Sequence, residues 1–572
     1  MSELCQSSSV RFKNRIAFEI YRDAYTYDRI TYGEFGGLAR RFASLLISLG
    51  VKPADRVMLI AENRPEWAIA YFGIAQAGAV CIPLLVDFSR EQIRAIISHA
   101  GPSALCVTEK TLPNIAGIPE EDARGAALPV IYLDSIENMR TETRAQRNEP
   151  DASALVSIRG SVKRLFLRDR ERFPDTEEDG VAAIVYTSGT LGDSKGVMLS
   201  NRNLVWTARA ACKRMKIYPR DRCLSVIPLA HTYECTIGLI SIVFNGASVV
   251  YLDRPPSPSV LADAMQALKP TLMLTVPLFI EKLYHSRIAP RLSKSVLYRF
   301  PLTRRIAERL AGRALLAAFG GGLRFLGVGG AALADEVERF LWNAQFPYAP
   351  GYGLTEASPL VAGTAPYRFR FRSSGKPLEG VEARVAARAG DRAEDFAAAR
   401  DYSDAGGYGE IQVRGPNVMS GYYRNEQATR EAFTEDGWLK TGDAGYVDGN
   451  GYLFIRGRLK TMIVTSSGEN IYPEDIELLL RQSPLVEDAL VCSGENGELV
   501  ALIVPSAAAY AAMEKTETRD TLRRSLNKRL AAFSRIDRIE VMTAPFEKTP
   551  TGKIKRFLYT RSCMRPARPG CE

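Results

Sequence analysis

The pattern of hydrophobic and polar positions repeats a strand-then-helix rhythm along most of the chain. In residues 30–49, apolar side chains recur at the three- and four-residue spacing of an amphipathic helix, and Gly50 is a typical helix end. Residues 51–60 predict a turn and a buried strand, residues 63–77 a second helix, and residues 80–85 a second strand. Strands that alternate with helices are typical of parallel sheets covered by helices, so the sequence predicts an α/β fold.

The alternation of strands and helices is interrupted once and begins again near the C-terminus. Residues 137–180 are strongly charged, which predicts a surface insertion or connection before the short apolar strand at 181–185. Near Gly451 the composition changes, and fresh strand–helix alternation follows. A chain of 572 residues is too long for a single core. We therefore predict a large N-terminal domain of several subdomains at 1–457 and a small, mobile α+β C-terminal domain at 458–572.

Composition and charge narrow the class of protein. A hydrophobic content of 46% and a charged content of 24% are typical of a globular protein. The net charge of +10 favours binding of phosphates, CoA-like anions, nucleic acid or an anionic membrane face. It is equally typical of a moderately basic surface that has no specific binding function. The nine cysteines are scattered without a C-x-x-C pair, and three histidines exclude a histidine-rich metal site. Because neither a secretory signal nor a membrane-spanning run is found, we expect a cytoplasmic protein.

Residues 293–319 carry arginines and a lysine among leucines and alanines. Such a segment can lie on an anionic membrane surface. It is also typical of an ordinary amphipathic helix pair with a solvated basic face. We favour the second interpretation because Glu308 interrupts the charge and Pro301 splits the run.

The strand at 181–185 leads into a candidate phosphate loop, Y-T-S-G-T-L-G-D-S-K-G at residues 186–196. Glycines let backbone N–H groups approach an anion closely, hydroxyls add donors, and a lysine adds a compact positive charge. The spacing differs from that of a Walker A loop. The candidate phosphate ligands are Thr187, Ser188, Gly189, Thr190 and Lys195.

Three later segments carry complementary chemistry. Residues 327–332 fit G-x-G-x-x-A, but the acidic residue expected about 20 positions on is missing, so a turn against a flat ring such as adenine is favoured over a nicotinamide site. In residues 350–356 a tyrosine that can stack on a base precedes a threonine and Glu356, a typical Mg²⁺ ligand. Asp443 follows a glycine, and we expect it to be exposed and to bind ribose hydroxyls.

These segments, in this order and with G-R-x-K at 457–460 and P-T-G-K-I-K-R at 550–556, resemble the adenylate-forming superfamily. That superfamily includes acyl-CoA synthetases, carrier-loading adenylation domains and beetle luciferases. The resemblance implies that the loop residues hold the β- and γ-phosphates of ATP, that Thr355 contacts the α-phosphate and that Glu356 holds Mg²⁺. It implies a ribose site at Asp443 and Arg458. The implied adenine contacts are Gly329, Gly330, Ala331, Tyr352 and Gly353.

The resemblance also implies that the C-terminal domain moves relative to the N-terminal domain. Lys460 corresponds to the hinge between the two domains, and Lys553 to the lysine that bridges the substrate carboxylate and the α-phosphate. Adenylation is a displacement between two anions, so positioning and charge neutralisation supply most of the catalysis. The alternative is that Lys553 has no catalytic role and belongs to a solvated basic tail.

Two motifs favour one branch of this superfamily. L-A-H-x-x-E at 229–234 and G-E-x-I-x-P-E-x-I-E at 468–477 resemble long-chain acyl-CoA synthetases. They imply that His231 lies beside the acyl carboxylate and that Gly468 lines the CoA pantetheine tunnel, although a lone histidine is as often structural. The tryptophan that follows the histidine in some relatives is absent, and Tyr233 is the nearest candidate for a gating aromatic.

The implied function is an ATP-dependent acid–thiol ligase. It would activate a fatty acid as acyl-AMP with release of pyrophosphate and then transfer the acyl group to CoA, with ATP, CoA and Mg²⁺ as cofactors. Two alternatives stay open: loading of the acyl group onto a carrier protein, and a non-catalytic nucleotide-binding relative. We expect no nucleic-acid partner, and peripheral contact with the inner membrane face stays open with residues 293–319.

Overall fold

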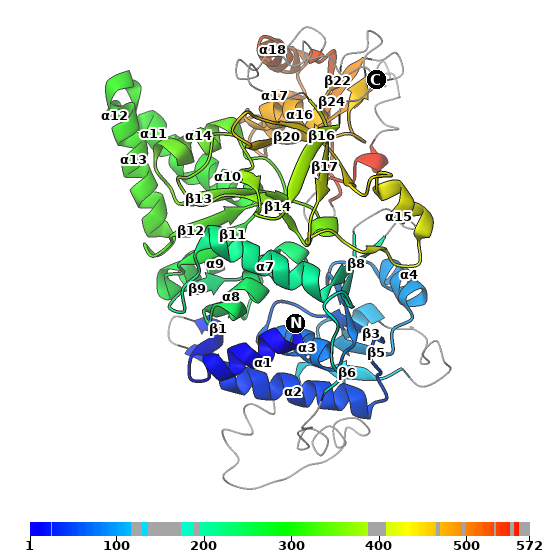
Figure 1. The fold of residues 1–572 in the computed structure, drawn as a ribbon. Coiled ribbons are helices and arrows are strands. Elements are labelled where there is room, and N and C mark those ends of the chain that lie inside the picture. The colour runs from blue at the N-terminus through cyan, green and yellow to red at the C-terminus, as the bar shows by residue number, and fades with distance from the viewer. Residues whose placement is uncertain are drawn as a thin grey trace.

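The computed structural model describes most of the chain (Figure 1). The described residues are 1–23, 26–115, 128–134, 173–187, 195–386, 408–464, 470–494, 498–530, 534–548 and 554–559. Most of the charged stretch at 137–180, and with it the predicted insertion, lies outside them. Among the described residues, no helix is long and apolar enough to cross a membrane.

A nine-stranded sheet forms the centre of the N-terminal domain. Its strands, in spatial order, are β15 (Lys376–Pro377), β14 (Leu360–Gly363), β13 (Tyr348–Gly353), β12 (Phe325–Val328), β11 (Leu272–Thr275), β9 (Arg222–Leu224), β10 (Ser248–Leu252), β1 (Ile16–Asp23) and β2 (Thr26–Thr31). The pairs from β13 to β1 are all parallel, and antiparallel pairs stand only at the two ends. The predicted parallel α/β architecture is therefore confirmed.

A second sheet of seven strands comes mainly from the first 200 residues. Its order is β18 (Gly421–Tyr422), β8 (Gly196–Ser200), β7 (Val181–Tyr186), β4 (Val80–Leu84), β3 (Arg56–Ile60), β5 (Ala104–Val107) and β6 (Val130–Tyr132). The pairs from β7 to β6 are parallel, whereas β8 runs antiparallel to both β7 and β18. The short strand β18 thus brings residues from far along the chain to the edge of this sheet.

Helices cover both sheets and fill the space between them. They are α1 (Ser2–Arg11), α2 (Tyr32–Ser48), α3 (Pro65–Gln76), α4 (Arg90–Ala100), α7 (Asn201–Met215), the π-helix η2 (Tyr233–Ile240), α8 (Ser241–Phe244), α9 (Pro258–Leu268), α10 (Pro277–Leu283), α11 (Ala289–Lys294), α12 (Val296–Arg299), α13 (Pro301–Ala318) and α14 (Asp335–Asn343). Thr31 and Glu34 form a reciprocal capping box that starts α2 where the sequence predicts a helix. Every residue of α3 is buried, because one continuous hydrophobic core spans both sheets.

Three smaller sheets complete the described part of the chain. A four-stranded antiparallel sheet contains β16 (Glu382–Ala386), β17 (Gly409–Arg414), β19 (Leu439–Val447) and β20 (Leu453–Arg458), and α15 (Glu426–Ala432) lies before β19. The smaller C-terminal domain has its own hydrophobic core. It consists of the hairpin β21 (Ile463–Val464) and β22 (Asn470–Ile471), the helices α16 (Pro473–Arg481), α17 (Tyr510–Met513) and α18 (Thr516–Asn527), and a sheet of β23 (Val486–Ser493), β24 (Leu499–Pro505) and β25 (Arg538–Val541).

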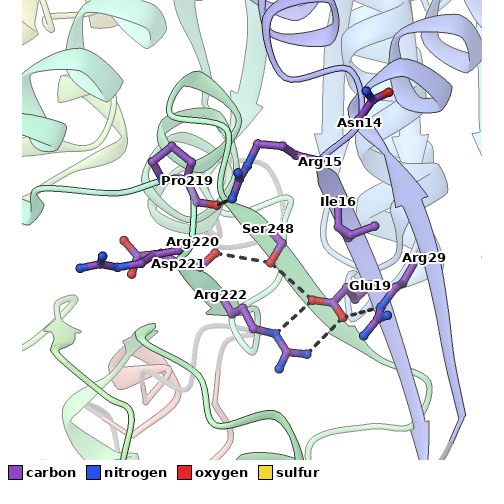
Figure 2. A pocket seen from close by; sticks show the side chains of 10 residues that line it. All are labelled: Asn14, Arg15, Ile16, Glu19, Arg29, Pro219, Arg220, Asp221, Arg222 and Ser248. Carbon is purple, nitrogen blue, oxygen red and sulfur yellow. Dashed lines mark hydrogen bonds and ion pairs between the residues drawn. The ribbon is translucent and has the colours of Figure 1, made fainter.

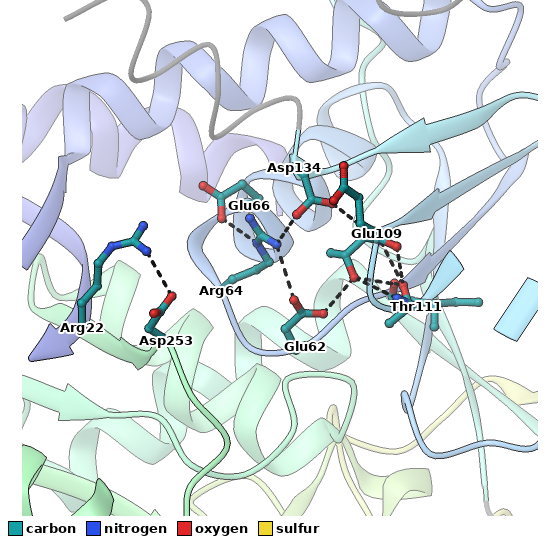
Figure 3. A network of polar contacts seen from close by, with 10 residues as sticks. Arg22, Glu62, Arg64, Glu66, Glu109, Thr111, Asp134 and Asp253 are labelled. Carbon is teal, nitrogen blue, oxygen red and sulfur yellow. Dashed lines mark hydrogen bonds and ion pairs between the residues drawn. The ribbon is translucent and has the colours of Figure 1, made fainter. Parts of the chain in front are cut away.

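The loop after β3 ties the carboxyl ends of neighbouring strands together (Figure 3). Arg64 pairs with Glu66 at 2.9 Å, with Asp134 after β6 at 2.7 Å and with Glu62 at 3.5 Å. Glu62 also accepts a hydrogen bond from the Thr108 hydroxyl after β5 at 2.9 Å. The network thus fixes the edge of the seven-stranded sheet at which the parallel strands end.

The same loop connects the two large sheets. The Asn63 amide donates to Ser225 Oγ at 3.0 Å and to the Ile227 carbonyl at 2.6 Å, and its oxygen accepts from the Leu229 N–H at 2.7 Å. These contacts position the segment that leads to His231.

Candidate active site

Three of the predicted segments follow the ends of strands in the two large sheets. The candidate phosphate loop leaves the carboxyl end of β7, the glycine turn leaves β12, and Glu356 follows β13. Ligand sites of open α/β sheets form beyond the carboxyl ends of parallel strands. The arrangement therefore brings the predicted phosphate, adenine and metal segments to the kind of edge at which nucleotides bind.

The base of the phosphate loop is closed by the β7–β8 pair. Tyr186 pairs with Gly196, and the Thr187 N–H donates to the Lys195 carbonyl at 3.2 Å. The predicted ligands Ser188, Gly189 and Thr190 lie outside the described residues. Lys195, at the far side of the loop, holds its ammonium 4.8 Å from the centre of the Tyr422 ring, a cation–π contact.

Tyr422 on β18 joins this lysine to the candidate metal ligand. Its hydroxyl donates to Glu356 Oε1 at 2.9 Å. Burial, together with the Glu356 carboxylate, raises the pKa of Tyr422 above its ordinary value, so the phenol stays a neutral donor. Sequence reasoning missed Tyr422, because a two-residue strand carries no periodic signal and nothing in residues 421–423 marks a nucleotide site.

Glu356 is held by the segment that precedes β18. It lies in the short 3₁₀ turn η4 (Thr355–Ala357), and its carbonyl accepts from the Met419 N–H at 2.8 Å. The buried Asn417 amide donates to the carbonyls of Ala357 at 3.3 Å and of Leu360 at 2.9 Å. These bonds fix the backbone of the turn that carries the predicted contacts Thr355 and Glu356.

The backbone around residue 353 leaves no room for any side chain, which explains why the residue is glycine. A Cβ at this position would lie 1.7 Å from the Pro359 carbonyl oxygen, so only glycine fits between Tyr352 and the turn. Its predicted role beside adenine is not tested by this contact.

The donor set suits a magnesium ion. Among the described residues, no group of three histidine, cysteine, aspartate or glutamate side chains gathers to form a protein-only metal cage. Magnesium is commonly held by one or two carboxylates together with substrate phosphates and water. A single carboxylate, Glu356, beside a loop predicted to hold phosphates fits that mode.

Asp443 corrects one expectation. It is 4% exposed rather than open to solvent, because β19 places it under Tyr352 and beside β20. The Tyr352 hydroxyl donates to Asp443 Oδ2 at 2.6 Å, and Arg458 Nε lies 2.8 Å from Oδ1. Burial alone would lower the pKa of Arg458, but the Asp443 carboxylate, together with smaller contributions from neighbouring acidic groups, outweighs burial, and the pKa is raised. The two predicted ribose ligands and the predicted adenine contact Tyr352 therefore form one connected unit.

The glycine turn after β12 packs on Tyr233. A Cβ on Gly327 would lie 2.8 Å from the Tyr233 hydroxyl oxygen, and one on Gly329 would lie 3.2 Å from its ring. Gly330 has a φ of +90°, which favours glycine, and Gly330 and Ala331 are exposed. The turn thus offers an open surface for a flat ring, and Tyr233, the suggested gate, supports it from behind.

His231 lies two positions before Tyr233 in the sequence and is half-buried. Its Nδ1 accepts from the Tyr233 N–H at 3.2 Å, so in the neutral ring the proton stands on Nε2. This contact orients the imidazole, and its predicted place beside an acyl carboxylate stays a prediction.

Three predicted residues belong to the C-terminal side. Lys460 is exposed in a turn in which the Thr461 N–H donates to the Arg458 carbonyl at 3.2 Å. Gly468 and Lys553 lie outside the described residues.

Glu234, three positions after His231, is a buried carboxyl on the π-helix η2. It is 0% exposed, and neither oxygen has a hydrogen-bond partner among the described residues. Gly238 leaves room for it, since a Cβ there would lie 2.7 Å from Glu234 Cδ. Burial raises the pKa of Glu234 to about 8, so the carboxyl is protonated at neutral pH.

Replacing Glu234 with glutamine is expected to change how stability depends on pH. Between the ordinary carboxyl pKa and about 8, the folded protein holds one proton more than the unfolded chain. Stability therefore falls as pH rises through this window, by up to about 1.4 kcal/mol per pH unit. The neutral glutamine removes that slope, so Glu234→Gln should gain stability relative to the natural protein as pH increases. Denaturation midpoints of both proteins at about pH 5 and about pH 8 measure the difference, and parallel profiles would contradict the assignment.

One cavity among the described residues is not part of this site. It has a volume of about 490 Å³ and is lined by residues of β1, β2, β9 and β10 and the loops beside them (Figure 2). Its charged walls are satisfied internally, since Glu19 pairs with Arg29 at 3.2 Å and with Arg222 at 3.1 Å. No predicted site residue lines it.

Comparison with known proteins shows the family. The family described as AMP-binding enzyme matches residues 5–423, and the family described as AMP-binding enzyme C-terminal domain matches residues 460–562. Long-chain-fatty-acid–CoA ligase FadD15 of Mycobacterium tuberculosis is 32% identical over 502 residues, which cover 83% of this chain and 77% of that protein. Human long-chain-fatty-acid–CoA ligase ACSBG1 is 28% identical over 513 residues, with 83% and 67% covered.

Solved structures show the same fold. ATP-bound MatB from Rhodopseudomonas palustris has a TM-score of 0.75 at 24% identity, with 98% of each chain covered. The o-succinylbenzoate CoA synthetase MenE of Bacillus subtilis, in complex with its acyl-adenylate, has a TM-score of 0.72 at 22% identity, with 100% of this chain and 99% of that chain covered. The chain therefore belongs to the adenylate-forming, AMP-binding enzyme family, among its acyl-CoA ligases.

Proposed function

We propose that this acyl-CoA ligase acts on long-chain fatty acids in two steps. A carboxylate oxygen of the acid attacks the α-phosphorus of ATP, pyrophosphate leaves, and acyl-AMP forms. The thiolate of CoA then attacks the acyl carbonyl carbon, and AMP leaves. Both nucleophiles belong to substrates, so no cysteine of the chain is required.

The observation that carries this proposal is the Lys195–Tyr422–Glu356 contact chain. It joins the predicted phosphate loop to the predicted metal ligand across two sheets, at 4.8 Å and 2.9 Å. An ammonium and a carboxylate-bound cation on either side of a polyphosphate would neutralise a leaving pyrophosphate. A bound Mg²⁺ would supply Lewis-acid charge there.

The remaining roles are part of the same proposal. We assign the ribose to Asp443 and Arg458, adenine to the turn at Gly329–Ala331 and to Tyr352, and the α-phosphate to Thr355. We assign the pantetheine tunnel to Gly468 and the bridging positive charge to Lys553, on the motifs that contain them. His231, oriented by the Tyr233 N–H, is assigned to the acyl carboxylate.

The long-chain assignment rests on the similarity to FadD15 and ACSBG1, which are named as long-chain-fatty-acid–CoA ligases. A carrier protein in place of CoA is the second candidate for the acyl acceptor, because adenylation chemistry is common to both. We propose a cytoplasmic location with peripheral membrane contact, since a long-chain acid partitions into bilayers.

Pyrophosphate release from ATP tests the proposal. Short, medium and long acids are compared, each without acceptor, with CoA and with a phosphopantetheinyl carrier protein. We expect multiple turnovers only with CoA and the largest kcat/KM with long chains. Turnover restricted to the carrier protein would favour the second candidate, and absence of pyrophosphate with every acid would indicate a non-catalytic relative.

We also propose domain boundaries at 1–457 and 458–572, with a hinge at Lys460. Replacing Lys460 with proline places a fixed φ at the third position of the turn between Arg458 and Thr461, where proline is disfavoured. Acyl-AMP formation should persist, whereas overall CoA ligation should slow several-fold because the C-terminal domain can no longer reorient. Single-turnover assays of the two half-reactions measure this, with Lys460→Ala as the control. Equal loss of both half-reactions would contradict a hinge.

A further inference from the structure

The outward surface of α12 and α13, here called the α12–α13 surface, concentrates exposed apolar side chains. In Figure 1 the two helices stand at one edge of the N-terminal domain, and α12 lies at the extremity. Of the 14 exposed large hydrophobic side chains in the described part of the chain, six lie between residues 296 and 310. They are Val296, Leu297, Phe300, Leu302, Ile306 and Leu310. A local concentration of this kind marks an interaction site rather than ordinary surface.

The geometry of α13 shows that these side chains form a second apolar face. The helix buries one stripe, which includes Ala307, Gly312 and Leu315, against the protein. Leu302, Ile306 and Leu310 recur at every fourth residue on the opposite side and are 95%, 53% and 50% exposed. A helix that only covers a core carries polar residues there. The helix pair predicted from residues 293–319 is therefore present, but its outer face is not simply a solvated basic one.

Arginines interleave with the aliphatic residues. Arg305, Arg309 and Arg313 also recur at every fourth position and lie on the same outward side of α13. These three, with Arg299 at the end of α12 and Lys294 at the end of α11, form no ion pair with any described residue and are exposed. Elsewhere many arginines are paired, as in the Arg64 and Arg222 clusters.

The charge of this surface has a single sign. From residue 282 to residue 334 the sequence contains one acidic residue, Glu308. Glu308 is 3% exposed and lies 3.5 Å from Arg304 on the buried side of the helix. Arg304 is further engaged by the Tyr298 hydroxyl at 2.7 Å. The five cations named above thus have no counter-charge within the described part of the chain, and an anionic partner would provide it.

We propose that the α12–α13 surface docks on an anionic lipid bilayer, with its aliphatic side chains at the boundary of headgroups and acyl chains and its arginines at the lipid phosphates. Aliphatic side chains among cations are the composition of helices that lie in a bilayer interface. A second copy of the chain is a poor partner, because a symmetric contact would place two like-charged faces against each other. The surface argument uses none of the ligase residues.

Vesicle co-sedimentation of the full chain tests the proposal, without ATP, acid or CoA. Vesicles of phosphatidylcholine are compared with vesicles that also contain phosphatidylglycerol, at low and high salt. We expect binding only to the anionic vesicles and a marked loss at high salt, because screening weakens the attraction. Equal binding to both vesicle types, or to neither, would overturn the proposal.

Two variants separate the aliphatic and the charged contributions. Phe300→Ser combined with Leu302→Ser removes exposed apolar area, and Arg305→Glu combined with Arg309→Glu reverses charge. Each should weaken partitioning at least about tenfold while the thermal midpoint stays unchanged, because these side chains are outside the core.

Matched controls lie on distant helices and loops. Val10→Ser removes an equally exposed aliphatic side chain from α1, and Arg41→Glu with Lys52→Glu reverses two exposed charges near α2. Both controls should bind vesicles as the natural protein does. Lipid docking at this surface is wrong if the controls lose binding as strongly as the α12–α13 variants. It is also wrong if light scattering shows that the natural protein forms a dimer and that the variant carrying Leu302→Ser does not.

Discussion

Replacing Asp443 with alanine is expected to lower kcat/KM for ATP in pyrophosphate exchange by at least about 10²-fold. In the proposed complex both ribose hydroxyls donate to this carboxylate, and a hydrogen bond to a charged group contributes about 1.5–3 kcal/mol. The side chain is already fixed by the Tyr352 hydroxyl at 2.6 Å and by Arg458 at 2.8 Å, so no ordering is required when the nucleotide binds. The loss should appear mainly as an increase in KM for ATP.

Tyr352→Phe is the matched control for this experiment. It removes the hydroxyl that orients Asp443 but keeps the ring and the carboxylate, so ATP affinity should fall less than tenfold, about the value of one hydrogen bond. A similar loss in both variants would mean that Asp443 acts only as a structural partner of Tyr352. An unchanged KM in Asp443→Ala would remove the ribose assignment altogether.

How far the sequence predicts this site depends on what kind of contact makes it. The start of α2 was predictable because Thr31 and Glu34 interact within four residues, and the parallel sheets were predictable from local alternation. Tyr422 was not predictable, because its role arises only when β18 pairs with β8 and turns its ring toward Lys195 and Glu356.

The burial of Asp443 has the same origin. Its neighbours in sequence, Gly442 and Lys440, are those of a surface turn, and the Tyr352 hydroxyl that contacts the side chain comes from another sheet. The same limit applies to residues 293–319. The sequence predicted the helices there, but the outward apolar stripe can be recognised only from the burial of each side chain in the structure. Local interactions are thus legible in the sequence, whereas contacts between sheets are set by packing.

The second large effect concerns stability. Replacing Arg64 with alanine is expected to lower the free energy of unfolding of the N-terminal domain by about 3–5 kcal/mol, the range for breaking a buried ion pair from one side. The reason is the Glu66 carboxylate, which is 0% exposed and pairs with Arg64 at 2.9 Å, so that its charge would remain buried without this guanidinium. Asp134 and Glu62 would lose the same partner, and the carboxyl edge of the seven-stranded sheet would lose its fixed loop. Chemical denaturation measures the change.

Arg202 offers a control of matched chemistry and different burial. It also contacts two carboxylates, Glu178 at 3.1 Å and Asp179 at 3.0 Å, but those side chains are 80% and 73% exposed. Arg202→Ala should therefore cost only about 0–1 kcal/mol, because water solvates the released charges and screens the pair. The double variant Arg64→Ala with Glu66→Ala should recover part of the loss, since no carboxylate stays buried at position 66. Equal costs for Arg64→Ala and Arg202→Ala would show that burial of Glu66 does not govern this network.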